Sequence, residues 1–204
     1  MTRVFDGNEL VIATHNEGKL KEIREMLGDS TITFYSAGDL NLEDPEETED
    51  SFIGNAVLKA KASAGATGKV ALADDSGLAV DALNGDPGIY SARWAGSDRD
   101  RDFDMAMGLV NDKLGDNPNR RAKFVCAMAL VWPDGHVETV EGEIYGNLVW
   151  PTRGENGMGY DPMFQPDGEE RTFGEMSSEE KHSISHRADA LQKIIQKCFK
   201  QQAA

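Results

Sequence analysis

The sequence contains only two cysteines, Cys126 and Cys198, among 204 residues. A disulfide scaffold or a metal-thiolate site needs more cysteines than that. Cys126 lies in an apolar run that is typical of a strand, and Cys198 lies on the apolar side of the last predicted helix. We therefore expect both to be reduced core residues, because a buried free cysteine behaves as a small apolar side chain.

Long hydrophobic runs are also absent. The longest, residues 10–13 and 125–132, are much shorter than the roughly 18 residues that a membrane-spanning helix needs. The first seven residues lack the apolar stretch of a secretion signal. We therefore expect a cytoplasmic protein with no membrane partner.

Positive charge is scarce. Lys and Arg number 21 against 36 Asp and Glu, which gives a formal net charge of −15. Such a surface repels nucleic-acid backbones and anionic membranes, so we expect no nucleic-acid partner. With 39% hydrophobic residues the chain can still build a packed core. Its length fits one domain over residues 1–204.

The pattern of apolar residues predicts helices and strands that alternate at first, followed by a hairpin. The segments expected, in order, are a strand at 10–14, a helix at 20–28, a loop at 39–50, a helix at 52–66, two short extended runs within 70–81, a helix at 103–114, hairpin strands at 123–132 and 136–145, a glycine-rich loop at 150–161 and one long C-terminal helix. This order is typical of an α/β fold with a mixed sheet.

The sequence allows two alternative starts for each of two helices. Either Asp50 or Ser51 caps the helix at 52–66. Ser183 or Ser185 begins the last helix, and Ser177 with Glu180 can form a capping box one turn earlier.

Asp74-Asp75-Ser76-Gly77 has the composition of a turn, and we expect it to form a hinge between two extended runs. Two adjacent acids are costly to bury unless a cation is near, and carboxylate oxygens suit Mg²⁺. If the extended backbone instead continues to Asp75, the two acids point to opposite faces and only one enters a given site.

Two further segments are candidate sites, one for an anion and one where a carboxylate and an ammonium can approach the same ligand. The loop Thr14–Lys19 lies between a predicted strand and a helix, where backbone N–H groups and the lysine favour a phosphate. It is not a Walker A loop, because it has one glycine and no Ser or Thr after the lysine. Beyond the acidic segment 46–50, Asn55 and Lys59 are four residues apart and share a helix face.

A fourth candidate combines the glycine-rich stretch 157–162 with Lys181, His186 and Arg187. A glycine-rich loop lets a flat ligand approach the backbone. Arg187 offers a planar fork of N–H donors, and His186 offers a donor whose charge depends on pH. Lys181 and His186 are five residues apart, so both reach one ligand only if the helix begins between them.

Taken together, these stretches resemble the inosine/xanthosine triphosphate pyrophosphatases, a family that hydrolyses non-standard purine nucleoside triphosphates. The matching stretches occur in the family's order and cover nearly the whole chain. They are ATHNEGKLKEI (13–23), EET followed by F..NA..KA (46–60), ALADDSGLAVDAL.G.PGIYSARWAG (71–96), GYDPMF (159–164) and EEKHSISHRADAL (179–191).

The resemblance implies an elongated mixed-sheet fold with two lobes flanking a central nucleotide-binding cleft, and a homodimer. It implies hydrolysis of ITP, dITP and XTP to the monophosphate and pyrophosphate, which keeps these nucleotides out of DNA and RNA. Asp75 would be the catalytic base, and Glu47 and Asp75 would hold Mg²⁺. The substrate-binding residues would be Thr14, His15, Asn16, Glu17, Gly18, Lys19, Lys59, Ser76, Met158, Gly159, Tyr160, Asp161, Lys181, His186 and Arg187.

The chemistry of the purine base offers a reason for selectivity. Arg187 and backbone N–H groups only donate hydrogen bonds, so they favour the six-keto oxygen of ITP and XTP over the amino group of ATP. The family usually has an aromatic residue where Met158 stands, so a thioether would replace stacking on the base. Two rival functions are a pyrophosphatase for pyrimidine or modified nucleotides, and a module that senses nucleotides without hydrolysing them.

Overall fold

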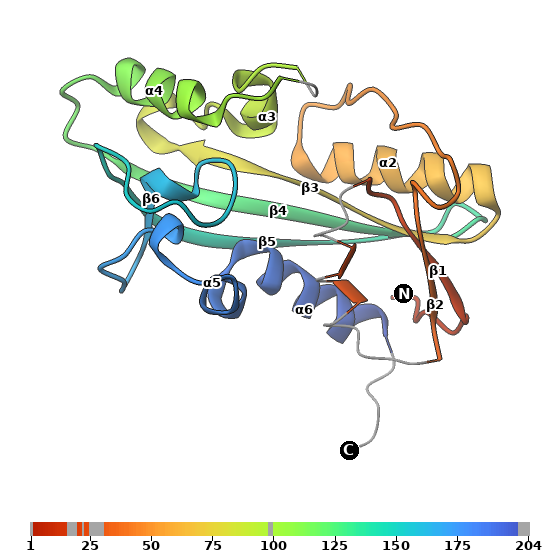
Figure 1. Cartoon of the computed structure of the whole chain (residues 1–204). Helices are drawn as coiled ribbons and strands as arrows, with labels where there is room; N and C mark the ends of the chain where they lie inside the picture. The colour runs from red at the N-terminus through yellow and green to blue at the C-terminus, as the bar shows by residue number, and fades with distance from the viewer. Residues whose placement is uncertain (1, 16–19, 22, 25–30, 98–99, 200–204) are drawn as a thin grey trace. The chain divides into compact units, whose positions relative to one another are not determined.

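The computed structural model describes residues 2–15, 20–21, 23–24, 31–97 and 100–199. Within these residues six strands form one sheet in the order β2-β1-β3-β4-β5-β6 (Figure 1). The strands are β1 (Glu9–Ile12), β2 (Thr33–Ser36), β3 (Val70–Val80), β4 (Arg121–Val131), β5 (Val137–Leu148) and β6 (Phe164–Pro166). The helices are α2 (Phe52–Thr67), α3 (Ser91–Trp94), α4 (Phe103–Leu114), α5 (Ser178–Ile184) and α6 (His186–Cys198).

The sheet is mixed, as the sequence predicts. β1 pairs in parallel with β2 and with β3, so that Leu10 lies opposite both Phe34 and Val70. β5 and β6 are antiparallel. β4 and β5 are neighbours joined by a short turn in which the Trp132 N–H donates to the His136 carbonyl. So short a connection makes them the predicted hairpin, which confirms the mixed-sheet α/β class.

The chain divides into two compact units, each made of separate segments. The first comprises Met1–Asp75, Cys126–Gly142 and Asp189–Ala204, and the second comprises Ser76–Val125 and Glu143–Ala188. Each unit has buried apolar clusters of its own. The expected single domain over residues 1–204 stays a prediction.

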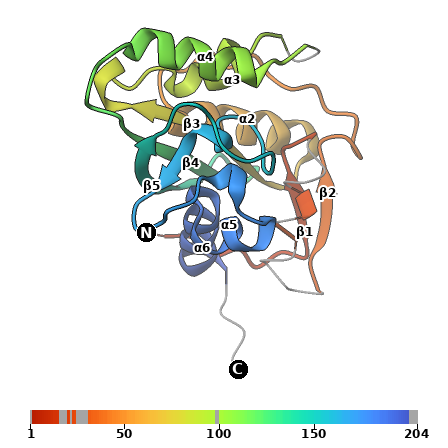
Figure 2. The same ribbon diagram turned by 60° about the vertical axis from the view of Figure 1, so that its left-hand side comes forward.

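In the first unit, helices cover both faces of the sheet (Figures 1 and 2). On one face α2 packs the small residues Ala56, Ala60 and Ala64 against alternate residues of β1, β3 and β4. On the other face α6 packs Leu191 and Ile194 against the intervening strand residues. Both cysteines are fully buried in this second cluster, which confirms their expected place in the core: Cys126 and Cys198.

The second unit is built around aromatic side chains. Phe124 of β4 packs against Phe164 and Phe173, with ring centroids 4.5 Å and 6.1 Å away. Helix α4 closes this core with the stripe that the sequence predicts, since Met107, Val110 and Leu114 are buried and Phe103 is partly buried. In the residues that the structure describes, no helix is long and apolar enough to cross a membrane.

Helix α2 begins and ends as its sequence indicates. The Ser51 side chain accepts a hydrogen bond from the Gly54 N–H, so Ser51, and not Asp50, is the cap. Gly68 ends the helix with a φ of 66°, a left-handed conformation that glycine adopts without strain. The acidic segment before the helix is a loop, as predicted.

The turn predicted at Asp74–Gly77 is wrong, because β3 is one continuous strand from Val70 to Val80. Asp74 and Asp75 are only 6% and 8% exposed. A lysine and an asparagine of α2 contact the Asp75 carboxylate, so this acid does not need a solvated turn.

The C-terminal helix was expected to begin at Ser183 or Ser185 and to include Ile184; the start at Ser185 is confirmed, and the inclusion of Ile184 is wrong. α5 ends at Ile184, Ser185 is extended with φ −71° and ψ 156°, and α6 begins at His186. Ile184, expected on the apolar face of the last helix, is 39% exposed on α5. The capping box of Ser177 and Glu180 is confirmed, and it starts α5.

Candidate active site

Asp75 lies on the face of the sheet that α2 covers. Ala71 and Ala73 of β3 pack in the cluster beneath α2, whereas Leu72 packs on the opposite face. Because side chains alternate along a strand, the Asp75 side chain lies on the same face as those of Ala71 and Ala73. The continuous strand thus directs Asp75, and not Asp74, toward α2.

The ammonium of Lys59 joins two carboxylates. Its Nζ lies 2.8 Å from Glu47 Oε1 and 3.5 Å from Asp75 Oδ1. The Lys59 and Asp75 side chains are only 15% and 10% exposed, so solvent screens their attraction less than at an open surface. We call Glu47, Lys59 and Asp75 the carboxylate-lysine cluster.

Burial and neighbouring charge shift two pKa values in this cluster. Burial raises the pKa of Asp75, and the Glu47 carboxylate raises it further, against the opposing effect of Lys59. Burial alone would lower the pKa of Lys59, but Asp75, Asp74 and Glu47 together raise it above its ordinary value. Lys59 therefore carries a positive charge at neutral pH, and Asp75 is a better proton acceptor than an ordinary aspartate.

Asn55 is bonded to this cluster, although it is not among the substrate-binding or metal-binding residues that the resemblance implies. Its side chain is fully buried, its Nδ2 donates to Asp75 Oδ2 at 3.1 Å, and its Oδ1 accepts from the Glu49 N–H at 3.1 Å. The sequence signal was available, since Asn55 and Lys59 are one turn apart on one helix face. The sequence did not show which strand faces these two side chains.

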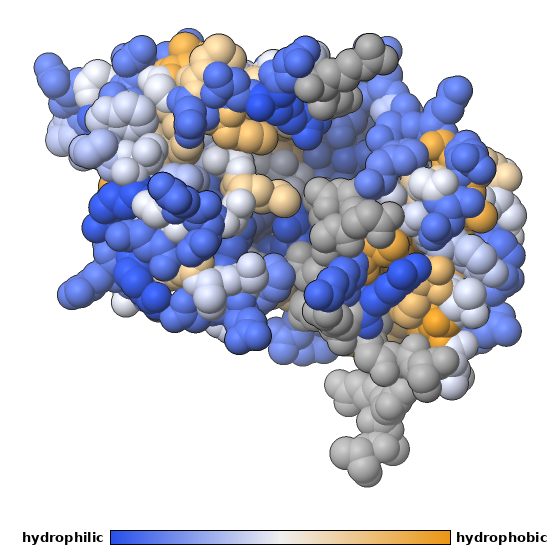
Figure 3. Space-filling view, viewed as in Figure 1, coloured by the Kyte–Doolittle hydropathy of each residue, from blue (hydrophilic) through white to orange (hydrophobic). Residues whose placement is uncertain are grey.

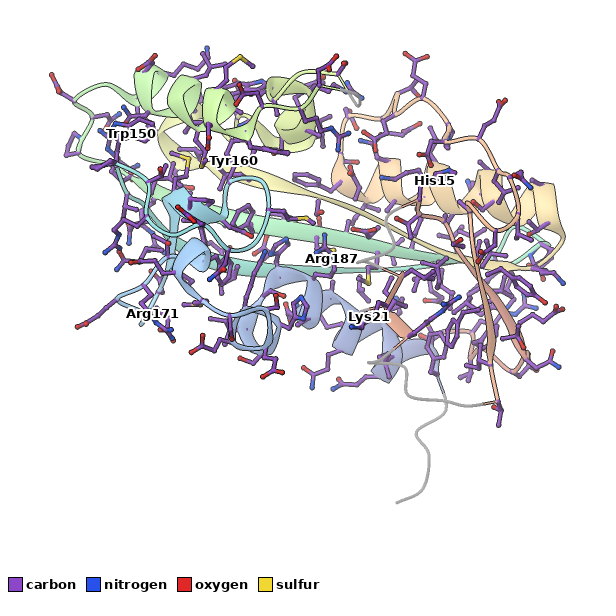
Figure 4. The ribbon with its side chains drawn as sticks, in the orientation of Figure 1. His15, Lys21, Trp150, Tyr160, Arg171 and Arg187 are labelled. Carbon is purple, nitrogen blue, oxygen red and sulfur yellow. The ribbon has the colours of Figure 1, made fainter. Side chains whose placement is uncertain are left out.

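The predicted phosphate loop is described only at its beginning. Thr14 is 9% exposed and its N–H donates to the Ile12 carbonyl. The His15 side chain is 42% exposed, with Nε2 3.5 Å from Asp44 Oδ1 (Figure 4). The remaining predicted residues, 16–19, lie outside the described part of the chain.

In the second unit, Asp161 holds the glycine-rich loop and Lys181 together. Its carboxylate is 2% exposed and accepts from the Met158 N–H at 2.7 Å and from Lys181 Nζ at 2.5 Å. The same ammonium lies 5.4 Å from the centre of the Phe173 ring. Oδ2 of Asp161 is therefore bonded to two protein groups, and the predicted substrate contact of this residue stays a prediction.

The loop itself exposes Met158, whereas Tyr160 is part of the core. Met158 is 56% exposed and Tyr160 only 2%. The Tyr160 hydroxyl donates to the Ser91 carbonyl, and its ring packs edge-on against Phe103 of α4 (Figure 4). Burial raises the pKa of Tyr160. Of the two side chains, only Met158 is presented to a ligand.

His186 and Arg187 start α6, immediately after the break at Ser185. A helix start between Lys181 and His186 is the condition under which both can reach one ligand. The His186 ring is 6% exposed and stacks on Phe124 at 4.9 Å. Arg187 Nη2 donates to Ser76 Oγ at 3.3 Å (Figure 4).

The predicted site residues thus fall into separate groups, each within one unit. The first unit holds the carboxylate-lysine cluster, and the second holds one group around Asp161 and another around Arg187. Among the described residues, no three His, Cys, Asp or Glu side chains gather closely enough to form a metal site by themselves. In the described part of the chain, the carboxylates that meet at the Lys59 ammonium are those of Glu47 and Asp75.

Comparison with known proteins places these features in a family. Residues 10–197 match the Ham1 family and include all five stretches quoted above. A dITP/XTP pyrophosphatase of Rhodospirillum centenum is 56% identical over 97% of this chain and 98% of its own length. A dITP/XTP pyrophosphatase of Gluconobacter oxydans is 52% identical over 98% and 95%.

Solved structures agree. A HAM1 protein from Coxiella burnetii matches with a TM-score of 0.87 and 38% identity, over 92% of this chain and 96% of that one. A nucleoside-triphosphatase, described as a dITP/XTP pyrophosphatase, from Mycobacterium abscessus matches with a TM-score of 0.78 and 41% identity, over 92% and 98%. The resemblance predicted from the sequence is confirmed, and the chain belongs to the Ham1 family.

Proposed function

We propose that this protein hydrolyses the non-standard purine nucleoside triphosphates ITP, dITP and XTP to the monophosphate and pyrophosphate. The observation that carries the proposal is the carboxylate-lysine cluster, in which Glu47 and Asp75 meet one buried ammonium. A triphosphate needs positive charge for binding and a proton acceptor for hydrolysis, and this cluster offers both. A module that only senses nucleotides has no use for an acceptor there.

The residues fit the Mg²⁺ that the resemblance implies. Glu47 and Asp75 share one cation, the Lys59 ammonium, so both carboxylates would face a metal bound beside it. Mg²⁺ in nucleotide sites is held by one or two carboxylates, and phosphate oxygens and waters complete its shell. When bound, the metal offsets negative charge on the phosphate oxygens.

The reaction breaks the bond between the α-phosphorus and the oxygen that bridges to the β-phosphorus. Asp75 orients a water molecule and takes its proton, while the water oxygen bonds to the α-phosphorus and pyrophosphate leaves with the bridging oxygen. The raised pKa of Asp75 suits a proton acceptor. The Lys59 ammonium contacts both carboxylates and can also contact the phosphates.

Selection of the base rests on hydrogen-bond donors. Arg187 and backbone N–H groups are donors only, so they bind the keto oxygen at position six of hypoxanthine or xanthine. Adenine places an amino group there, and each mismatched polar group costs about 1–3 kcal/mol. Met158, 56% exposed on the glycine-rich loop, covers the base with a thioether.

We also propose that the protein is a cytoplasmic homodimer that binds neither nucleic acid nor membranes. Two buried cysteines that form no disulfide fit a reducing compartment, and the net charge of −15 disfavours anionic polymers and surfaces. A partner surface is supported by large apolar side chains exposed on the second unit, among them Met105 and Leu109 of α4 (Figure 3). Light scattering of the protein as it elutes from a size-exclusion column measures the mass of the assembly and so tests the homodimer.

A substrate panel tests the function. ITP, XTP, dITP, GTP, ATP, dTTP and UTP are each incubated with the protein and Mg²⁺, and phosphate is measured with malachite green with and without added inorganic pyrophosphatase. We expect signal that depends on the added pyrophosphatase, with ITP and XTP ahead of ATP. Equal kcat/KM for ATP would overturn the donor argument, preference for dTTP or UTP would indicate a pyrimidine enzyme, and binding without any turnover would indicate a sensor.

A further inference from the structure

Asn55 is a fully buried amide in the first turn of α2, one turn before Lys59. It uses both ends of its side chain: Nδ2 donates to Asp75 Oδ2, and Oδ1 accepts from the Glu49 N–H, each at 3.1 Å. Asp75 belongs to β3, and Glu49 belongs to the acidic loop that precedes α2. One side chain thus connects a helix, a strand and a loop.

These two hydrogen bonds hold the Asp75 carboxylate and the backbone close to Glu47, which are the two acidic parts of the carboxylate-lysine cluster. Asn55 holds Oδ2 of Asp75, whereas the Lys59 ammonium contacts Oδ1, so the carboxylate is bonded at both oxygens from one helix face. Glu49 is two residues beyond Glu47 in the acidic loop. Fixing the Glu49 backbone therefore restricts where the Glu47 carboxylate lies.

We propose that Asn55 is a positioning residue that sets the separation and orientation of the Asp75 and Glu47 carboxylates, and so prepares them to share a divalent cation. The inference rests on the proposed function, because it assigns Asn55 to the same site. Carboxylates that bind metals are commonly held by such second partners, whose loss lowers metal affinity or activity about 10–100-fold.

Asparagine is suited to this task for a chemical reason. The Asp75 carboxylate needs a donor and the Glu49 N–H needs an acceptor, and a planar amide presents one of each on a short, stiff stem. Leucine has nearly the same shape but offers neither. Asn55→Leu therefore removes both bonds with little change in volume, while Asn55→Ala removes them and leaves space for a water molecule to bridge the two groups.

The test compares Asn55→Leu and Asn55→Ala with wild type in two assays. The first is binding of Mn²⁺ to the nucleotide-free protein, followed by the electron paramagnetic resonance signal of free Mn²⁺. The second is the steady-state kinetics of ITP hydrolysis. Ala64→Gly is the matched control, because Ala64 is buried in the same helix and the glycine weakens α2 without touching the cluster.

We expect Asn55→Leu to bind Mn²⁺ about tenfold more weakly and to lose about 10–100-fold in kcat. Its KM for ITP should stay within about threefold, because the groups expected to hold the base are untouched. Asn55→Ala should show the same pattern, less strongly. Ala64→Gly should lower the melting temperature by a few degrees and leave Mn²⁺ binding and kcat unchanged within about twofold.

Several outcomes overturn the proposal. It fails if both Asn55 variants bind Mn²⁺ and turn over ITP as wild type does, or if Ala64→Gly loses as much kcat and Mn²⁺ affinity as they do. It also fails if wild type and Asn55→Leu alike bind no Mn²⁺. Should Asn55→Leu not fold, Asn55→Ala decides. If wild type binds Mn²⁺ but hydrolyses no nucleotide, the proposed function fails, and the Mn²⁺ comparison alone judges Asn55.

Discussion

Glu138 carries a prediction about stability at low pH. This residue of β5 is 7% exposed, and its carboxylate accepts from the Arg3 N–H at 2.9 Å. It also lies 2.8 Å from His136 Nε2 and 2.9 Å from Lys197 Nζ. Burial alone would raise the pKa of Glu138, but these partners outweigh it and lower the pKa from 4.5 to about 2.

The sign and size of the effect follow from this shift. Because the pKa is lower in the folded state, the charged carboxylate stabilises the fold above pH 4.5, and that stability is lost as the pH falls toward 2. This lowering of the Glu138 pKa corresponds to roughly 3 kcal/mol. Integrating between the two pKa values, about 2 kcal/mol of this should already be lost at pH 3.

Urea unfolding of wild type and Glu138→Gln at pH 7 and pH 3 measures this contribution. The glutamine cannot titrate, so the difference in unfolding free energy between the two proteins should shrink by about 2 kcal/mol at the lower pH. Glu141→Gln, an exposed position of the same strand, is the control and should differ little from wild type at either pH. A wild-type advantage of equal size at pH 7 and pH 3 would refute the reasoning.

Three further predictions concern the site. Asp75→Asn should still bind ITP by calorimetry, but lower kcat by a few orders of magnitude, because the proton acceptor and one metal ligand are lost; nearly unaltered pyrophosphate release would remove Asp75 from the mechanism. Arg187→Met should lower kcat/KM for ITP about 10–100-fold and for ATP much less, so an unchanged ITP-to-ATP ratio would contradict its role. Gly157→Ala should raise KM for ITP more than it lowers kcat. Gly157 has a φ of 79°, and a methyl group there would lie 2.1 Å from Asp161 Oδ2. The methyl group would therefore displace the hydrogen bonds that Asp161 makes with Lys181 and the loop. An unchanged KM would speak against this arrangement.

The sequence predicted the class of fold because the decisive patterns are local. The stripe of α4, the caps of α2 and the hairpin of β4 and β5 each follow from spacing or from turn residues within one segment. The error at Asp74–Gly77 came from long-range contacts. The acids of β3 read as a turn because their partners lie on another element, and Asn55 and Lys59 contact Asp75 only when α2 packs on the sheet.

The break before α6 is a second place where the sequence pattern did not determine the structure. Ile184 fits the apolar spacing of a continuous helix, yet it is exposed on α5, and Ser185 turns the chain so that His186 starts a new helix. The Ser185 hydroxyl accepts from the Ala188 N–H, a capping bond that the sequence allowed as one of two choices. Periodicity alone does not choose between such starts.

For the site, residue types and spacing identified the chemistry, but not which side chains meet. The pairing of Lys59 with Glu47 and Asp75 joins three separate segments. Spacing indicated that Lys59 and a carboxylate of residues 46–50 can approach one ligand, but it did not connect them with Asp75. Tyr160 and Asp161, predicted to contact substrate, have side chains that other protein groups occupy. The role of each expected ligand stays a prediction until nucleotide is bound.

Hydrolysis of ITP in water enriched in ¹⁸O tests the central claim most directly. If water attacks the α-phosphorus, mass spectrometry of the products should show one ¹⁸O in inosine monophosphate and none in pyrophosphate. Formation of inosine diphosphate and inorganic phosphate, or ¹⁸O in the pyrophosphate, would contradict the account.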